Sequence, residues 1–468
     1  SVEPSTAAVS RNGDLYTLTG NVGTTIIIDK DNVTIDGAGY SLLGNFSRGV
    51  WLNNRVGVTV KNLTIQNVEN AFDLSRAADN TLIGNTIINC SKGFYLWISW
   101  RNNIIENTLT NAWRAFDIWG AETASSQHNL ITNNTIQNST AGIILSQPNN
   151  EFSNNLIVNC SELGIGLHAD SNVLRNNTLI ANKVNFEVSA FKNIVDESNT
   201  INGKPIIYWV GLNNRTVPQN AAYVVLTNCN NIHMRELDVE GIAVYETSDS
   251  LISENRIIGT YDRTKPTTQP TPSLFRSSTA NYGIQLVKST NITLSGNTVW
   301  NKIYGVKVVN STSNTLIGNS INGNRYYGLY LTYSHNNTIN ENTIAENGFI
   351  TESFSLGEAF GVSISDSSYN QFIANNVTNN NHWGIRVLSN QHDNVFYHNN
   401  FIDNKPPDNN LQVSMLGLYP DKPANPSIWD NGIEGNYWSD YLTRYTNASE
   451  VDNTGIGNTP FVINENNI

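Results

Sequence analysis

The sequence predicts an all-β protein in which short strands coil into a parallel β-helix, and two observations support this fold. The first is a period, because an Asn followed by two strand-forming residues recurs every 21 to 27 residues, at Asn85, Asn107, Asn134, Asn155, Asn177 and Asn199, and resumes at Asn297, Asn319 and Asn342. A fixed period of this size is typical of a solenoid. The second is the apolar/polar alternation between these marks, as in VTVKNLTI and GIGLHA, which indicates strands and not helices. Three strands of about 4–6 residues per coil of about 22 residues account for both patterns.

Asparagine is about one residue in six, and only 14% of residues are charged. Asn favours turns over helix interiors, and at one turn of each coil its amides can stack into a hydrogen-bonded ladder. The net charge of -12 and pI near 5.0 argue against a nucleic-acid partner. No apolar run reaches the length of about 18 residues that a transmembrane helix requires.

The three cysteines, Cys90, Cys160 and Cys229, each follow an Asn and therefore occupy equivalent places in the repeat. Cys90 and Cys160 are separated by three coils, on the order of 14 Å at the usual strand spacing. That exceeds the Cα separation of about 7 Å that a disulfide tolerates. We expect buried free thiols.

The repeat divides the chain into a β-helix over 1–402 and an irregular segment, 403–468, that caps the open end and finishes in a Gly-rich turn. Two stretches interrupt the period and are predicted to be inserted loops: 260–281, which is rich in Pro and Thr, and 347–360.

One strand per coil follows a regular register in the first half of the chain. In FYLW (94–97) and FDIW (116–119) the first and third residues are apolar and are predicted to point inward. The second and fourth then form two outward columns. One column contains Trp51, Asp73, Tyr95, Asp117, Ile144, Gly166 and Glu187, and the other contains Asn53, Ser75, Trp97, Trp119, Ser146, His168 and Ser189.

These columns place aromatic rings beside carboxylates, with arginines in the neighbouring turns. Sugars are bound by such surfaces, which stack on ring faces and hydrogen-bond to polar groups. The candidate carbohydrate-binding residues are Tyr95, Trp97, Trp119, Asp73, Asp117, Arg76 and Arg101. Two alternatives remain open: a protein or self-contact patch, and packing beneath an overlying loop.

The same residues offer an enzymatic alternative. Asp73 and Asp117 are two coils apart, about 9–10 Å, which is near the separation of the carboxylates in inverting glycosidases. A lyase instead needs a base and a group that neutralises a substrate carboxylate, for which Tyr95 with Arg76 or Arg101 are candidates. No catalytic signature accompanies them, so a polysaccharide lyase, hydrolase or epimerase is the alternative and binding is the preferred interpretation.

Three stretches resemble NosD-like proteins of the right-handed parallel β-helix superfamily, in particular archaeal surface proteins. They are SRNGDLYTLTGNVGTTIIIDKDNVTIDGAGYSLLG, NTINGKPIIYWVGLNNRTVPQNAAYVVLTNCNNI and EGNYWSDY with DNTGIGNTPFVI. The resemblance implies a right-handed coil and a secreted or cell-surface location. It also carries a copper label, although copper sites need clustered His, Met or Cys. Met234, Met415, His382, His392 and His398 are scattered, so copper binding is not expected and no cofactor is required.

Relatives of this kind carry an acidic Gly-rich loop near the C-terminus, which suits calcium because that ion prefers several carboxylate oxygens. Here the corresponding loop, 450–458, keeps two acids. The candidate calcium ligands are Glu450, Asp452 and Asn458. The alternative is a plain Gly turn.

Fourteen Asn-x-Ser/Thr sequons are candidate glycosylation sites in a secreted protein. Their asparagines are Asn32, Asn45, Asn62, Asn89, Asn133, Asn138, Asn159, Asn176, Asn214, Asn291, Asn310, Asn336, Asn376 and Asn447. The chain also begins without Met, as expected after removal of a signal segment. The sequence as a whole predicts a secreted or surface-exposed scaffold or adhesin that contacts glycans. Assembly of copies into surface layers or filaments is a further alternative.

Overall fold

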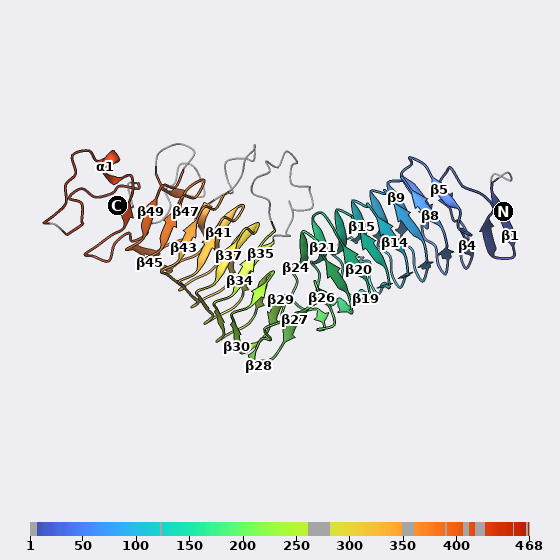
Figure 1. The fold of residues 1–468 in the computed structure, drawn as a ribbon, viewed down its shortest axis with the longest axis horizontal. Coiled ribbons are helices and arrows are strands. Elements are labelled where there is room, and N and C mark those ends of the chain that lie inside the picture. The colour runs from blue at the N-terminus through green and yellow to red at the C-terminus, as the bar shows by residue number, and fades with distance from the viewer. Residues whose placement is uncertain are drawn as a thin grey trace. The chain divides into compact units, whose positions relative to one another are not determined.

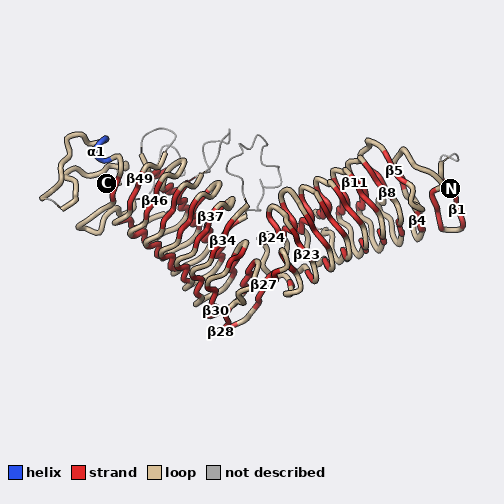
Figure 2. The backbone as a smooth tube through the Cα atoms, viewed as in Figure 1, coloured by secondary structure: helices blue, strands red, loops and turns tan. Residues whose placement is uncertain are grey.

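The computed structural model describes residues 7–121, 124–260, 281–348, 360–388, 391–405, 411–416, 426–452, 454–464 and 467. The chain divides into two compact units, Ser1–Tyr208 and Trp209–Ile468. Each unit is a stack of parallel strands joined by turns, drawn as arrows in Figure 1 and in red in Figure 2. The pairing of each strand with the equivalent strand one coil later confirms the right-handed parallel β-helix.

Each coil of the first unit adds one strand to each of three sheets, named here A, B and C. Sheet A contains β2 (Leu15–Leu18), β4 (Thr34–Asp36), β7 (Thr59–Lys61), β10 (Thr81–Ile83), β13 (Asn103–Ile105), β16 (Leu130–Thr132), β19 (Glu151–Ser153), β22 (Val173–Arg175) and β25 (Ile194–Val195). Sheet B contains β5 (Ser41–Leu43), β8 (Thr64–Gln66), β11 (Thr86–Ile88), β14 (Thr108–Thr110), β17 (Thr135–Gln137), β20 (Leu156–Val158), β23 (Thr178–Ile180) and β26 (Thr200–Ile201). Sheet C contains β3 (Ile26–Ile27), β6 (Arg48–Trp51), β9 (Asn70–Ser75), β12 (Lys92–Trp97), β15 (Arg114–Trp119), β18 (Ala141–Leu145), β21 (Leu163–Leu167) and β24 (Val184–Val188).

Antiparallel strands occur at both ends of this stack. At the start, β1 (Val9–Asn12) pairs antiparallel with β2. At the finish, β27 (Lys204–Val210) turns back along β26 through Asn202 and Gly203, whose φ angles of 49° and 80° are both positive. An Asn-Gly pair adopts such angles at little cost and is the preferred two-residue hairpin turn. The parallel coil of the first unit therefore ends at this hairpin.

The second unit repeats the design in sheets D, E and F. Sheet D contains β29 (Tyr223–Thr227), β32 (Ile242–Tyr245), β35 (Tyr282–Val287), β38 (Tyr304–Val309), β41 (Tyr327–Thr332), β44 (Phe360–Ser365), β47 (Ile385–Leu388) and β50 (Val413–Leu416). Sheet E contains β28 (Asn213–Thr216), β30 (Asn230–Arg235), β33 (Leu251–Ser253), β36 (Thr293–Ser295), β39 (Thr315–Ile317), β42 (Thr338–Asn340), β45 (Gln371–Ile373) and β48 (Val395–Tyr397). Sheet F contains β31 (Asp238–Val239), β34 (Arg256–Ile258), β37 (Thr298–Trp300), β40 (Ser320–Asn322), β43 (Thr343–Ala345), β46 (Asn376–Thr378), β49 (Asn400–Ile402) and β51 (Tyr437–Trp438).

The segment 403–468 contributes β50 and β51, which pair with β47 and β49, and the short helix α1 (Tyr441–Arg444). Its role as a cap stays a prediction. The predicted loops 260–281 and 347–360 lie almost wholly outside the described residues. Within the described ranges, no helix is both long and apolar enough to cross a membrane.

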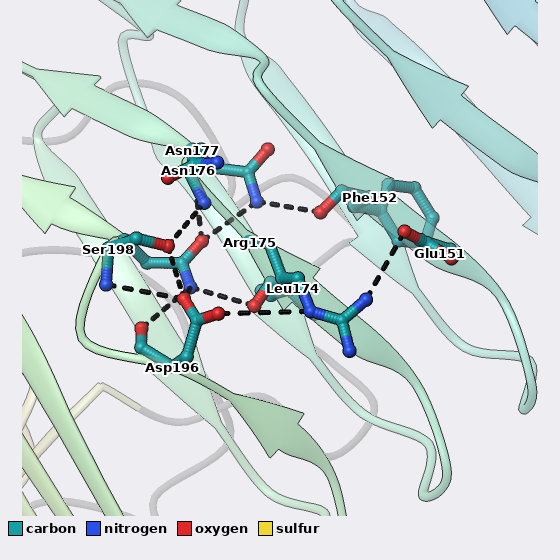
Figure 3. Close-up of polar contacts among 9 residues, drawn as sticks. Glu151, Phe152, Leu174, Arg175, Asn176, Asn177, Asp196 and Ser198 are labelled. Carbon is teal, nitrogen blue, oxygen red and sulfur yellow. Dashed lines mark hydrogen bonds and ion pairs between the residues drawn. The ribbon is translucent and has the colours of Figure 1, made fainter.

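Asparagine ladders line the turns, as the sequence predicts. Between sheets A and B, Asn85 donates to Asn107 Oδ1 at 3.0 Å, and Asn107 donates to Asn134 Oδ1 at 3.0 Å. Figure 3 shows a later part of this ladder, where Asn177 Nδ2 donates to the Phe152 carbonyl at 2.9 Å. The structure adds columns that were not predicted, at Asn80, Asn102, Asn129 and Asn150 in the first unit and at Asn314, Asn337, Asn370 and Asn394 in the second.

The interior is apolar and also stacked. In sheet C, Phe72, Phe94 and Phe116 lie one above another with ring centroids 5.1 and 5.0 Å apart, and all three are fully buried. The inward orientation predicted for this register is therefore confirmed. The three cysteines are buried free thiols, also as predicted, and burial raises the pKa of Cys160 to about 12. A thiol with such a pKa is unreactive at neutral pH.

Candidate functional site

The outer face of sheet C in the first unit brings aromatic and charged side chains together on consecutive coils. Tyr95 lies directly opposite Asp73 on one neighbouring strand and Asp117 on the other, and Trp97 lies between Ser75 and Trp119. We call the outward residues of β6, β9, β12 and β15, with Arg76 at the end of β9, the aromatic face. Its members are Arg48, Trp51, Asp73, Ser75, Arg76, Lys92, Tyr95, Trp97, Arg114, Asp117 and Trp119.

Asp117 holds the centre of this face. Its Oδ1 accepts hydrogen bonds from Arg114 Nη1 at 2.7 Å and from Trp119 Nε1 at 2.6 Å, and its Oδ2 lies 2.9 Å from Lys92 Nζ. The residue is only 2% exposed. A buried carboxylate is costly unless it is paired and hydrogen-bonded. Here Oδ1 accepts both hydrogen bonds, and Oδ2 is balanced by the Lys92 charge without a hydrogen bond.

Asp73 has a similar arrangement two coils away. Its Oδ2 accepts from Arg48 Nε and its Oδ1 from Ser75 Oγ, both at 2.6 Å, and it is 1% exposed. Both carboxylates considered as catalytic candidates thus lie beneath the cations that neutralise them. In this structure they act as counter-ions that position arginine and lysine.

The aromatic rings carry cations on their faces. The Arg48 guanidinium lies 4.8 Å from the Trp51 ring centroid, Lys92 Nζ lies 4.4 Å from that of Tyr95, and the Arg76 guanidinium lies 5.0 Å from that of Trp97. Cation–π attraction favours each arrangement. The fourth aromatic residue of the face, Trp119, is 44% exposed and is more exposed than Trp51, Tyr95 and Trp97. The face thus presents one open ring and several cations seated on the other rings.

Tyr95 is poorly suited to be a base. Burial raises the pKa of the Tyr95 phenol, and the negative charges of Asp117 and Asp73 raise it further. Because the phenolate is disfavoured, the side chain stays protonated at neutral pH and serves as a hydrogen-bond donor or acceptor.

Arg101 does not join this face. It forms a two-pronged pair with Asp79, with both N–O distances at 2.7 Å, in the turn that leads from sheet C to sheet A. Sequence reasoning included Arg101, but it missed Arg48 and Lys92. These two residues begin their strands in the order cation, Gly, apolar residue (RGV and KGF), which is the signal that could have found them.

The residues considered for copper do not converge. His392 Nδ1 pairs with Asp393 at 2.8 Å, His398 Nε2 pairs with Glu434 at 2.7 Å, and His382 packs against Phe360 in another turn. Met234 and Met415 are buried in the core. Among the described residues, no three His, Cys, Asp or Glu side chains form a group that could hold a metal ion.

In the C-terminal loop, Glu450 and Asn458 form hydrogen bonds within the loop itself. Glu450 accepts a hydrogen bond from the Gly455 backbone N–H, and Asn458 Oδ1 accepts from the Ser449 backbone N–H at 3.0 Å. Asp452 adopts a positive φ of 50° at the turn. The local contacts of Glu450 and Asn458 are those of a closed turn, and calcium binding by Glu450, Asp452 and Asn458 stays a prediction.

Comparison with known proteins identifies the family to which the chain belongs. A family model described as "Periplasmic copper-binding protein (NosD)" matches residues 17–211 and 214–443. The chain belongs to the NosD family. The resemblance to NosD-like proteins that was inferred from the sequence is thereby confirmed, whereas the likeness to archaeal surface proteins stays a prediction. The copper in the family description finds no fitting donor set among the residues that the structure describes, as shown above for the histidines and methionines.

Solved structures with similar coils include three with sugar or surface roles in their own names. The periplasmic alginate epimerase AlgG is 11% identical over 92% of this chain and 80% of its own, with a TM-score of 0.30. A tailspike protein of E. coli bacteriophage HK620 in complex with pentasaccharide is 11% identical (86% and 72% covered, TM-score 0.34). PfbA, a surface adhesin of Streptococcus pneumoniae, is 11% identical (75% and 84% covered, TM-score 0.27). A search among curated proteins gives no match.

Proposed function

We propose that this protein is an extracytoplasmic β-helix scaffold that binds a glycan on the aromatic face of sheet C. The observation that carries the proposal is the conjunction of the open Trp119 ring with cations and a phenol on adjacent strands. Parallel strands about 4.8 Å apart hold these groups in a rigid row, which lowers the entropy cost of binding an extended chain. Location outside the cytoplasm is supported by the family description as periplasmic.

An enzymatic use of the same face has less support. A general acid or nucleophile must reach the substrate, whereas Asp73 and Asp117 are 1% and 2% exposed. Burial and the nearby Asp117 and Asp73 raise the pKa of Tyr95, which disfavours the phenolate that a catalytic base would need. We therefore favour binding without turnover over lyase, hydrolase or epimerase activity.

The test is Trp119→Ala, measured by affinity electrophoresis and calorimetry against a panel of soluble polysaccharides. Loss of a stacking ring is expected to weaken binding by about tenfold or more, which corresponds to about 1.4 kcal/mol. Trp300→Ala is the matched control, because Trp300 is similarly exposed, at 40%, on β37 of the second unit. Equal binding by the two variants, or no binding of any glycan by the wild type, would contradict the proposal.

A second prediction concerns the sequons. All fourteen sequon asparagines are exposed, and eleven adopt the left-handed backbone of a turn. The buried ladder residues Asn85, Asn107 and Asn134 are excluded from sequons because an apolar core residue stands two positions later. We expect protein purified from its native source to exceed the polypeptide mass of 51.7 kDa, with peptide mapping placing the added mass on the turn asparagines. A native mass equal to that of the polypeptide would show that the sequons are unused.

A further inference from the structure

We infer that the glycan bound by the aromatic face is anionic, a polymer whose sugar units carry carboxylates. This inference rests on the proposed function and specifies its substrate class. It starts from the order of charges across the face, in which the carboxylates lie inside and the cations outside.

The exposed fractions of the side chains establish that order. Those of Arg48, Lys92 and Arg114 are 42%, 22% and 11% exposed, whereas those of Asp73 and Asp117 are each 2% exposed. Arg76 is exposed as well. Glu69, in the turn before β9, is an exposed carboxylate at the border of the aromatic face. The net charge of the face with Glu69 included is still positive, from four cations (Arg48, Arg76, Lys92 and Arg114) and three acids (Glu69, Asp73 and Asp117). An approaching ligand therefore meets Arg76, Arg48 and Lys92 first, whereas Arg114 is buried beside Asp117.

The stacked guanidinium groups are available to a carboxylate. Arg76 lies over the Trp97 ring, and within the described residues it has no ion pair. Arg48 gives only its Nε to Asp73. A guanidinium seated on a ring keeps its N–H groups directed outward in its own plane, which is the geometry that binds a carboxylate through two hydrogen bonds. A neutral sugar can accept hydrogen bonds from these donors, but it carries no negative charge and forms no charge-assisted, two-pronged pair with them.

The whole chain carries a net charge of -12, which opposes an anionic ligand at long range. At physiological salt, however, charges further away than about 8–10 Å are largely screened. The local cations of the aromatic face therefore decide the preference. Because each exposed pair contributes little alone, several cations must act together, and the affinity must depend on salt.

The experiment compares a polyuronate, such as polygalacturonate, with the same polymer after its carboxyl groups have been reduced to hydroxymethyl groups. We expect the wild-type chain to bind the polyuronate about tenfold more tightly than the reduced polymer, and to lose about tenfold in affinity between about 0.05 and 0.5 M NaCl. Equal binding of the two polymers would overturn the anionic class while leaving glycan binding intact. Binding of neither would overturn both proposals.

Arg76→Gln is the informative variant, because Arg76 supports no buried carboxylate and its replacement leaves Asp73 and Asp117 paired. Affinity for the polyuronate is expected to fall about fivefold, with affinity for the reduced polymer unchanged. Arg175→Gln is the matched control: Arg175 is exposed on sheet A of the same unit and lies between Glu151 and Asp196, at 3.4 and 3.8 Å (Figure 3). Equal affinities of the two variants for the polyuronate would overturn the assignment of Arg76.

Discussion

Asn107→Ala is expected to lower the free energy of unfolding by about 3 kcal/mol, because it leaves several buried polar groups without partners. Asn107 Oδ1 accepts from the Asn85 backbone N–H at 2.9 Å and from its side chain at 3.0 Å. Asn107 Nδ2 donates to the Leu82 and Ile105 carbonyls, at 2.9 and 3.0 Å, and to Asn134. The residue is fully buried, so water cannot replace these bonds.

Urea unfolding monitored by circular dichroism measures this change, and Asn111→Gly provides the control. Asn111 is exposed at the next turn, adopts a φ of 58° and makes one side-chain bond, to Asn89 at 3.0 Å. Glycine accepts that left-handed backbone, so the control is expected to change stability by less than about 1 kcal/mol. If both variants shift the urea midpoint equally, the buried ladder contributes no more than an exposed turn.

The register of sheet C could be predicted because two periods act on the same residues. Alternation along a strand decides which side chains point outward, and the coil period of about 22 residues decides which of them become neighbours. Together they place Tyr95 opposite Asp117, as the structure does. They also account for the stacked rings of Phe94 and Phe116 inside.

The outward orientation of Lys92 could not be predicted from the alternation of apolar and polar residues, because that alternation breaks at Gly93. Counting back from Phe94 by twos assigns Lys92 to the interior, yet Gly93 and Phe94 are both buried in succession. A Cβ on Gly93 would approach Leu109 Cδ2 to 2.3 Å and the Ala115 carbonyl to 2.5 Å, so Gly93 packs closely against the core. With Gly93 and Phe94 both buried, Lys92 lies outside and pairs with Asp117.

The partners of long side chains are a second limit. Arg76 and Arg101 occupy similar turns in the sequence, and both have positive φ. One guanidinium stacks on Trp97 and the other binds Asp79. The strand register brings a ring within reach of the first and a carboxylate within reach of the second, and neither contact follows from the local sequence.

Asp117→Asn is expected to lower the free energy of unfolding by about as much as Asn107→Ala does. The substitution removes the negative charge that pairs with Lys92 and Arg114. The two positive charges then lie close together with no carboxylate between them. Breaking a buried ion pair by removing one partner typically costs about 3–5 kcal/mol, and the remaining amide oxygen can still accept one hydrogen bond, so we expect about 3 kcal/mol.

Asp79→Asn makes the same chemical change at the surface, where Asp79 pairs with Arg101 and the two side chains are 42% and 56% exposed. Exposed pairs contribute about 0–1 kcal/mol because solvent screens them. Thermal and urea unfolding of the two variants should therefore differ by more than about 2 kcal/mol. Adding Lys92→Met to Asp117→Asn removes one of the uncompensated cations and should recover part of the loss. Equal destabilisation by Asp117→Asn and Asp79→Asn, without recovery in the double variant, would mean that Asp117 behaves as an ordinary surface charge and that the aromatic face is not built around it.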